Sequence, residues 1–472
     1  MNSFFISLLA SLRNSWSKSK GHSSRSSKSF LSSKSYKSYL SSSLVNHKRV
    51  YLDNAGATEV GRSARSALVE MLSLYGNPSG IHHEGTIAGH MLDRTRALCA
   101  SVLNAHAYEV YFVSSGTESC NLAVLGTYEG FLHNQKQTLE RHTTNTLPHI
   151  IVSAIEHPSV LEPVKFLERK GSVRVTYLPV YEEGIVKVKD LRDALCEQTI
   201  LVSVMYANNE IGTIQPVKEI GRLLEEYKKE RGLSHTAYPY FHIDACQAAN
   251  YCNLDVVRLR AHLMTVNSSK VYGPKGVALL YKREGVHLMP LSYGGGQERE
   301  LRSGTENIAS AYAFGVALTE AKEIEEEESA RTRALRDETV ESMKKQIPTI
   351  TFYGAFDAIS STNSLKQGST KELRRLPNNI NCRVKGISSE EMILRLDAQG
   401  FAVSHKSACA SMETDGSYVI TSLGATMQEA LENIRISIGR STTKKDMERL
   451  VEAMKEIAEK YTSTASHPAL FP

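Results

Sequence analysis

Short apolar runs alternate with longer stretches of helical periodicity from about residue 48 onward. Most of the apolar runs are continuous, which is typical of strands buried on both faces of a parallel sheet. The runs that we expect to form strands are His149–Ile155, Leu201–Tyr206, Tyr240–Ile243, Leu263–Asn267 and Val277–Tyr281. Between them, Val217–Glu230 spaces apolar residues along one face of a helix, with charged residues opposite. This alternation predicts an α/β domain.

A second group of elements follows Thr305. About 40 residues have helical character, and Glu325–Glu328 within them indicates a solvated helix face. The elements expected next are strands at Thr349–Tyr353, Asn379–Val384, Phe401–Ser404 and Asn433–Ile438 and helices near Ser389–Ala398 and Thr443–Thr462. We therefore expect a large domain over residues 48–315, a smaller C-terminal α/β domain over residues 316–472, and a mobile surface insertion at Ser360–Arg375.

The first 47 residues differ from the rest in composition. Eighteen of the first 43 residues are serine, and residues 1–50 hold nine lysines and arginines and no acid. With so few apolar residues the segment is expected to be disordered, and its composition is typical of an organelle transit peptide. An untargeted disordered tail is the alternative. The mitochondrial matrix is the first expectation for the location; a plastid-type organelle, which the apolar stretch Phe4–Leu12 keeps open, and the cytosol are the alternatives.

The distribution of charge and cysteine excludes several classes of protein. The net charge is +5, so the chain after residue 50 is mildly acidic and no nucleic-acid-binding surface is expected on it. No apolar run reaches the roughly 18 residues of a membrane span, which predicts a soluble protein without a membrane partner. Seven cysteines without a CxxC pair fit neither a disulfide framework nor a zinc site, which predicts a reducing compartment and no metal.

Small and polar residues gather in five segments directly after predicted strands. These segments are Ser114–Ser119, Glu156–Pro158, Asn208–Gly212, Asp244–Gln247 and Ser268–Gly276. In open α/β sheets, ligands bind just beyond the carboxyl ends of the strands. The segments therefore predict a ligand site at that edge of the sheet.

Three of these segments carry groups that suit pyridoxal phosphate. Ser114–Ser119 opens a helix, so its backbone N–H groups suit a phosphate, although a plain N-cap turn explains the pattern too. Asp244 suits a protonated pyridine nitrogen or, equally, a helix N-cap. Lys270 lies on a sharp turn where burial would lower its pKa and favour attack on an aldehyde; an ordinary surface lysine is the alternative. Together they supply what the phosphate, ring nitrogen and aldehyde of this cofactor need.

Other side chains suit acid–base and nucleophilic roles. His157, fixed in a turn by the following proline, could lie on a cofactor ring and exchange protons, or could be structural. Cys409 lies among small and polar residues with cationic neighbours, which favours a thiolate nucleophile over a buried inert thiol. Arg435 or Arg440 could hold a substrate carboxylate, with surface ion pairing as the alternative.

From about Val50 to Thr462 the chain resembles the NifS/IscS-like cysteine desulfurases of the class V aminotransferase fold family. The resemblance rests on Tyr51–Ala55 (YLDNA), Gly76–Ser79 (GNPS), Gly116–Ser119 (GTES), Asn208–Gly212 (NNEIG), Tyr272–Gly276 (YGPKG), Arg302–Thr305 (RSGT), Ser407–Cys409 (SAC) and Arg435–Arg440 (RISIGR). Any one motif would be weak, but their order over about 410 residues is specific. The resemblance implies a pyridoxal 5'-phosphate-dependent transferase of fold type I, with a mostly parallel sheet in the large domain and a smaller C-terminal α/β domain.

The resemblance also implies how the cofactor is held. It assigns Lys270 to the covalent link, Asp244 to the pyridine nitrogen, Gln247 to the phenolic oxygen, His157 to stacking on the ring, and Gly116 and Thr117 to the phosphate. Thr305 would reach the phosphate of the neighbouring subunit's cofactor, which implies a homodimer. Ser269 stands where these enzymes usually have His, and Asn267 where they usually have Ser; the Ser269 hydroxyl still suits the phosphate.

The substrate implied by the resemblance is L-cysteine. Asn209 and Arg435 would hold its carboxylate, and Lys270 would move its α-proton. The thiolate of Cys409 would then attack the substrate sulfur, giving a persulfide on Cys409 and releasing L-alanine. The pair His405-Lys406 stands where two small residues are usual, so the added charge would lower the pKa of Cys409 or the added bulk would stiffen its loop.

We therefore expect a cysteine desulfurase that supplies sulfur to iron–sulfur cluster or thio-cofactor synthesis through a protein acceptor such as an iron–sulfur scaffold. A selenocysteine lyase or another class V enzyme is the alternative among enzymes. A non-catalytic scaffold for sulfur transfer is the alternative from another class. Lys270, Asp244 and Cys409 together argue against the scaffold, because docking alone needs none of the three.

Overall fold

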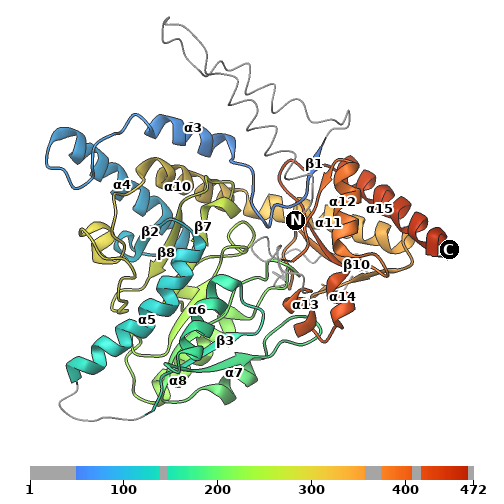
Figure 1. The fold of residues 1–472 in the computed structure, drawn as a ribbon. Coiled ribbons are helices and arrows are strands. Elements are labelled where there is room, and N and C mark those ends of the chain that lie inside the picture. The colour runs from blue at the N-terminus through green and yellow to red at the C-terminus, as the bar shows by residue number, and fades with distance from the viewer. Residues whose placement is uncertain (1–48, 139–145, 357–373, 407–415, 466–472) are drawn as a thin grey trace, which may run out of the picture. The chain divides into compact units, whose positions relative to one another are not determined.

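The computed structural model describes residues 49–138, 146–356, 374–406 and 416–465 of the 472-residue chain. Three features predicted from the sequence lie wholly or mostly outside the described residues: the leader over residues 1–47, the insertion at Ser360–Arg375 and the loop with Cys409. Figure 1 draws the segments outside the description as a thin grey trace.

A seven-stranded sheet forms the framework that positions the site (Figure 1). Its strands, in spatial order, are β2 (Val110–Val113), β8 (Ala278–Lys282), β7 (Leu263–Asn267), β6 (Tyr240–Asp244), β5 (Thr199–Ser203), β3 (His149–Ser153) and β4 (Arg174–Leu178). Neighbours from β7 to β4 pair in parallel, whereas β8 is antiparallel to both β7 and β2. The predicted mostly parallel α/β sheet is confirmed, but the strand predicted at Val277–Tyr281 is antiparallel.

Helices cover both faces of this sheet, which explains the continuous apolar runs. Ile150 and Val152 of β3 belong to the core cluster that includes α5 (Gly116–Thr138) and α6 (Pro158–Arg169). Ile151, between them, belongs to the cluster that includes α4 (His83–Leu103), α8 (Val217–Glu230) and α10 (Ile308–Glu323). Because successive side chains point to opposite faces of a strand, every residue of β3 is buried.

Three further helices complete this part of the chain. They are α3 (Arg62–Met71), which packs on α10 beside α4, and the shorter α7 (Val188–Ala194) and α9 (Val256–Leu259). None of the helices within the described ranges is both long and apolar enough to span a bilayer.

A second, three-stranded antiparallel sheet follows in the sequence. Its order is β12 (Asn433–Ser437), β10 (Asn379–Val384) and β9 (Ile350–Phe352), and it shares a core cluster with α11 (Glu325–Gln346), α12 (Ser389–Ala398) and α15 (Lys444–Ala465). The short helices α13 (Tyr418–Ser422) and α14 (Met427–Leu431) precede β12. The strands and helices predicted here are present, and the division of the chain at residues 315 and 316 stays a prediction.

The start of the described chain joins the elements near its end. Strand β1 (Val50–Tyr51) pairs in parallel with β11 (Phe401–Ala402), and Val50 and Leu52 pack in the same core cluster as β10 and β12.

The expectation that Glu325–Glu328 form a solvated helix face is wrong in part. Glu328, the last of the four consecutive glutamates, is buried and pairs with Arg331, with 2.7 Å between Oε2 and Nε.

Candidate active site

A cavity of about 150 Å³ lies beyond the carboxyl ends of β3, β5, β6 and β7. Its lining residues are Ala55, Gly56, Gly116, Thr117, His157, Ser159, Met205, Ala207, Asn209, Asp244, Cys246, Gln247, Asn267, Lys270 and Arg435. The segments that the sequence placed at strand ends therefore do meet at one site, as open α/β sheets require. Eight of the predicted site residues line this cavity: Gly116, Thr117, His157, Asn209, Asp244, Gln247, Lys270 and Arg435.

The first turn of α5 forms one wall of the cavity. Gly116 opens the helix, and a Cβ at this position would come within 3.1 Å of Cys246 Sγ and 3.3 Å of Asn267 Nδ2. A side chain here would be tightly packed, so glycine favours a close approach of the helix N-terminus, with its partial positive charge, to the cavity. The Ser115 hydroxyl also accepts a hydrogen bond from the Glu118 N–H at 3.2 Å, so the turn caps the helix as well.

Asp244, the last residue of β6, supplies a buried carboxylate. Its Oδ1 accepts a hydrogen bond from the Cys246 N–H at 3.0 Å, and Cys120 Sγ lies 3.7 Å from Oδ2. Turns rather than a helix follow the strand, so Asp244 is not a helix N-cap. An anion held in this way suits a cationic ring nitrogen, because a buried carboxylate needs a partner of opposite charge.

Lys270 reaches the cavity from a 3₁₀ turn, Ser268–Lys270, that follows β7. Its Nζ donates hydrogen bonds to the carbonyl oxygens of Ala55, at 2.8 Å, and Gly56. Tyr272, two residues later, has a φ of 64°, which makes the turn as sharp as the sequence predicted. Two backbone carbonyl oxygens thus hold the amine at the wall of the cavity.

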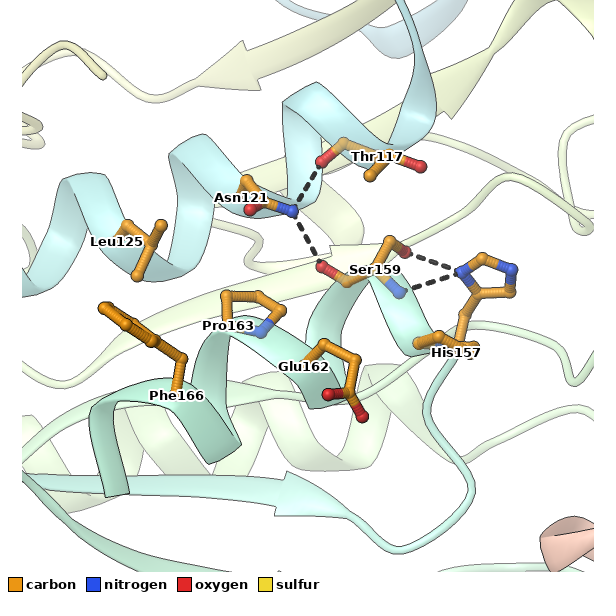
Figure 2. A pocket seen from close by; sticks show the side chains of 9 residues that line it. Thr117, Asn121, Leu125, His157, Ser159, Glu162, Pro163 and Phe166 are labelled. Atoms are coloured by element: carbon orange, nitrogen blue, oxygen red, sulfur yellow. Dashed lines mark hydrogen bonds between the residues drawn. The ribbon is translucent and has the colours of Figure 1, made fainter. Parts of the chain in front are cut away.

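His157 caps a helix and also lines the cavity. Its Nδ1 accepts a hydrogen bond from the Ser159 N–H at 3.1 Å, which caps α6, and its ring lines the cavity. Figure 2 shows the ring with its other nitrogen directed away from Ser159. Burial lowers the pKa of His157, an effect that Asp244 opposes and that Lys270 and Arg435 reinforce. A neutral ring with its proton on Nε2 suits stacking and proton exchange.

Asn209 and Arg435 lie together at the cavity, as the resemblance implied. Arg435 is only 1% exposed, and its Nη1 donates to the Asn209 carbonyl oxygen at 3.0 Å. Its Nη2 pairs with Asp53 Oδ1 at 2.7 Å. Arg440, the other arginine considered, pairs with Glu320 and is not among the residues that line the cavity. Of the two arginines, Arg435 therefore has the position of a carboxylate ligand.

Three predicted residues have other positions. Ser269 does not line the cavity; its carbonyl oxygen accepts from the Thr58 N–H at 2.9 Å, and Asn267 is the lining residue. Thr305 is exposed and lies outside the cavity lining. Its segment is tied to the first turn of α5 by Arg302, whose Nε lies 3.0 Å from Glu118 Oε1. Cys409 lies outside the described residues.

Sequence reasoning missed two neighbours of this cavity. Cys246 was assigned no role from the sequence, but its side chain lines the cavity, where burial and Asp244 raise the pKa of the thiol. Asp53 was read only as part of a motif, although its carboxylate pairs with Arg435. Cys246 and Asp53 each lie in a sequence segment that had already been identified as a motif. Their position within a motif is the signal that could have identified them as neighbours of the cavity.

Glu156, beside His157, is the third missed residue. It is fully buried, and its Oε1 accepts from the Met205 N–H at 2.8 Å and from the Ser153 hydroxyl at 2.5 Å. Its Oε2 is buried and has no hydrogen-bond partner within the described part of the chain. Burial raises the pKa of Glu156 to about 8, so the side chain is a neutral acid at neutral pH.

A second hollow, of about 460 Å³, opens between α5 and α6 and shares Thr117, His157 and Ser159 with the cavity. Figure 2 shows the side chains of Leu125, Pro163 and Phe166 around it. Asn121 joins the two helices, because its Nδ2 donates to the carbonyl oxygens of Thr117 at 2.9 Å and Ser159 at 3.2 Å (Figure 2).

The fold and the cavity agree with a comparison against known families. The aminotransferase class-V family model matches residues 50–450, and the chain belongs to this family. The predicted family, the fold class and the dependence on pyridoxal phosphate are thereby confirmed.

Two named proteins and a solved structure are similar to this chain over most of its length. The chain is 38% identical over 416 residues to a protein of Methanosarcina thermophila named cysteine desulfurase IscS, covering 88% of this chain and 93% of that protein. It is 36% identical over 415 residues to the protein of that name from Clostridium botulinum, covering 87% and 94%. A solved structure described as a NifS-like protein is 29% identical, with a TM-score of 0.74 over 88% of this chain and all of the other.

The residues at the cavity fit pyridoxal phosphate. The close approach at Gly116 leaves room for a phosphate at a helix N-terminus, and Asp244 offers a carboxylate to a ring nitrogen. The amine of Lys270 and the neutral imidazole of His157 line the same space. The chemistry of this set of groups matches the three ends of the cofactor.

Proposed function

We propose that this protein is a pyridoxal-phosphate-dependent cysteine desulfurase that converts L-cysteine to L-alanine and carries the sulfur on Cys409. The observation that supports the proposal most strongly is the meeting of Lys270, Asp244, His157 and Arg435 at one cavity in a class-V chain. The relatives named cysteine desulfurase, at 36 to 38% identity, support the choice of substrate.

The chain's own groups divide into those that hold the cofactor and those that act on substrate. Lys270 would bind the cofactor covalently, Asp244 would face its ring nitrogen and Gln247 its phenolic oxygen, while Gly116 and Thr117 would face the phosphate. When bound, the cofactor supplies an electron sink for the α-carbon of the substrate. His157 would lie on the ring and, being neutral, exchange a proton through Nε2.

Arg435 and Asn209 would orient the substrate by its carboxylate. The guanidinium is buried and fixed, so a carboxylate bound there would place the α-carbon toward Lys270. The Lys270 amine, once it is no longer bound covalently to the cofactor, would remove the α-proton of the substrate. The resemblance implies these roles, and the positions of the three side chains around one cavity support them.

The sulfur step requires a second thiol. The Cys409 thiolate would attack the substrate sulfur, so that an S–S bond forms as the substrate C–S bond breaks and a proton takes the place of sulfur on carbon. One L-cysteine and one Cys409 thiol thus give one L-alanine and one Cys409 persulfide, with no external oxidant. A thiol reductant would release the sulfur as sulfide.

Turnover of L-cysteine tests this proposal directly. With a thiol reductant present, we expect L-alanine and sulfide in equal amounts from the wild-type protein. Cys409→Ser should keep the absorbance of the bound cofactor and lose sulfide formation. Cys196→Ser, which removes a partly exposed thiol that does not line the cavity, is the matched control and should keep both. No alanine from the wild type would contradict the function, and sulfide from Cys409→Ser would contradict the nucleophile.

We further propose a homodimer, in which Thr305 of one chain reaches the cofactor phosphate of the other. The exposure of Thr305 in the single chain and the link from its segment to α5 support this arrangement. Sedimentation should give twice the chain mass, and Thr305→Ala should weaken cofactor retention without dissociating the dimer. A monomeric holoenzyme would contradict the proposal.

The destination of the sulfur and the compartment are proposals as well. We expect a protein acceptor such as an iron–sulfur scaffold, and delivery of the chain to the mitochondrial matrix by residues 1–47. Fusing these residues to a fluorescent protein should direct it to mitochondria. The same fusion with its lysines and arginines replaced by glutamine should remain in the cytosol, and equal behaviour of the two would contradict an address function.

A further inference from the structure

Asp53 forms an ion pair with one side of the Arg435 guanidinium. Its Oδ1 lies 2.7 Å from Arg435 Nη2, while Nη1 donates to the Asn209 carbonyl oxygen. The third nitrogen, Nε, is buried and has no hydrogen-bond partner within the described ranges. Arg435 is only 1% exposed, and its Nε–H is therefore a buried donor that can still form a hydrogen bond.

The position of Arg435 does not depend on Asp53. The residue lies within β12, where its backbone exchanges two hydrogen bonds with Ser404, at 2.6 and 3.1 Å. Its guanidinium is held by the Asn209 carbonyl oxygen and by burial. The main contribution of Asp53 is therefore its negative charge.

Asp53 also lies next to the backbone that holds Lys270. A Cβ on Gly56 would come within 2.5 Å of Asp53 Oδ2, and the Gly56 carbonyl oxygen accepts from Lys270 Nζ. The Asp53 side chain retains 24% of its exposure, so it can return to water when another anion takes its place. A substrate carboxylate that approached Arg435 would meet this anion first.

We propose that Asp53 is an internal stand-in for the substrate carboxylate, which keeps Arg435 paired until an α-amino acid displaces it. The incoming carboxylate would take Nη2 from Asp53 and use the unpaired Nε, forming the two-bond contact that guanidinium groups favour. The inference rests on the proposed role of Arg435. It predicts that Asp53 lowers affinity for carboxylates by competing for Arg435 and by repelling a second anion.

Binding of propionate to cofactor-free protein tests this idea. Propionate carries a carboxylate but no amine, so its binding reports on Arg435 and not on cofactor chemistry. We expect Asp53→Asn and Asp53→Ala to bind propionate about three- to tenfold more tightly than wild type by calorimetry. Asp397→Asn is the matched control, because Asp397 pairs with Arg49 in an exposed ion pair, and it should not change the affinity.

The opposite result has a clear meaning. If Asp53 serves only to position Arg435, both substitutions will weaken propionate binding, and the proposal is overturned; unchanged binding overturns it too. In the holoenzyme, the KM for L-cysteine should fall in Asp53→Asn while kcat changes less. Because the propionate measurement needs no turnover, it stands even if the wild type forms no alanine, so the two failures can be told apart.

Discussion

The two ends of the same strands bury different kinds of polar cluster. At the carboxyl ends, β6 and β7 lead to Asp244 and Lys270, which share a cavity with Arg435. At the amino ends, His262 precedes β7 and contacts Lys228 of α8, with 2.7 Å between Nε2 and Nζ. Both side chains of the second pair are almost fully buried, as are Asp244 and Arg435.

Backbone groups complete the hydrogen bonds of Lys228 and His262, the pair at the amino ends of the strands. His262 Nδ1 accepts a hydrogen bond from the Phe241 N–H at 3.2 Å, so a neutral His262 carries its proton on Nε2. The Nε2–H of His262 donates to the His235 carbonyl oxygen at 2.8 Å, and Lys228 Nζ, which lies 2.7 Å from Nε2, donates to the same oxygen at 3.0 Å. Burial and Arg283 lower the pKa of Lys228 to about 7.

The comparison teaches what separates a ligand site from a structural cluster. Buried ionisable groups occur at both ends, so burial and shifted pKa values do not distinguish them. At the carboxyl end a charged guanidinium keeps an unpaired N–H beside a cavity, whereas Lys228 and His262 are both hydrogen-bonded to the His235 carbonyl oxygen. The distinguishing property is therefore hydrogen-bonding capacity that only a ligand can use.

Replacing the two lysines should give the largest contrast. Lys270→Ala should lose the cofactor absorbance and reduce L-alanine formation by about a thousandfold or more, because the covalent link and the proton carrier are the same amine. Lys228→Met should retain activity within about threefold, since it replaces an uncharged amine by an apolar chain of similar length. Comparable losses in both variants would show that the distinction between the ends is wrong.

Glu156, at the carboxyl ends of the strands, should make the folded protein less stable as the pH rises. Its pKa is raised from 4.5 to about 8, so the folded state binds more protons than the unfolded state between these values. Stability from this group is present at low pH and is lost as the pH rises toward and through 8, by up to about 1.4 kcal/mol per pH unit. Between pH 6 and pH 8, the melting temperature of wild type should fall further than that of Glu156→Gln. Parallel curves would mean that Glu156 is ionised in the folded protein.

Lys228 should give the opposite slope at the amino end. Its pKa is lowered from 10.5 to about 7, so the folded state binds fewer protons than the unfolded state in this window. The unfolding free energy of wild type should therefore rise from pH 7 to pH 9 relative to Lys228→Met, by about the same amount as the Glu156 effect. Thermal unfolding of both proteins across this range measures it, and equal pH profiles would contradict a neutral Lys228.

Cys246 should give the smallest effect although its thiol lines the cavity. Burial and Asp244 raise its pKa, so it is a poor nucleophile at neutral pH. Cys246→Ala should change kcat/KM for L-cysteine by less than about threefold, in contrast to Cys409→Ser. If Cys246→Ala abolished persulfide formation, the sulfur carrier would have to be reassigned.

Much of the fold was predictable because burial leaves a local pattern. The strands β3, β5, β6 and β7 are buried at nearly every position, since helices cover both faces of the sheet, and each has apolar residues at most of its positions. Strand β4 escaped prediction because its residues are largely exposed or half-buried, so no apolar run marks it. The antiparallel direction of β8 was not predictable, because strand direction depends on the connection and not on composition.

The site was predictable where residues follow strand ends. Asp244, Lys270 and His157 each follow a strand, and a sheet edge brings such residues together. The pairing of Asp53 with Arg435 joins residues that lie 382 positions apart, and no local pattern records it. The protonation of Glu156 depends on an unpartnered oxygen, which exists only in the packed structure.

The pairing of β1 with β11 and of Asp53 with Arg435 also has a consequence for synthesis. Ribosomes add about 5 to 20 residues per second, so Asp53 waits roughly 20 to 80 s for the arginine 382 residues downstream. During that interval Val50 and Leu52, which are buried in the finished fold, have no core to enter. A nascent chain of this protein therefore cannot complete the ion pair of Asp53 with Arg435 until nearly all of it has been made.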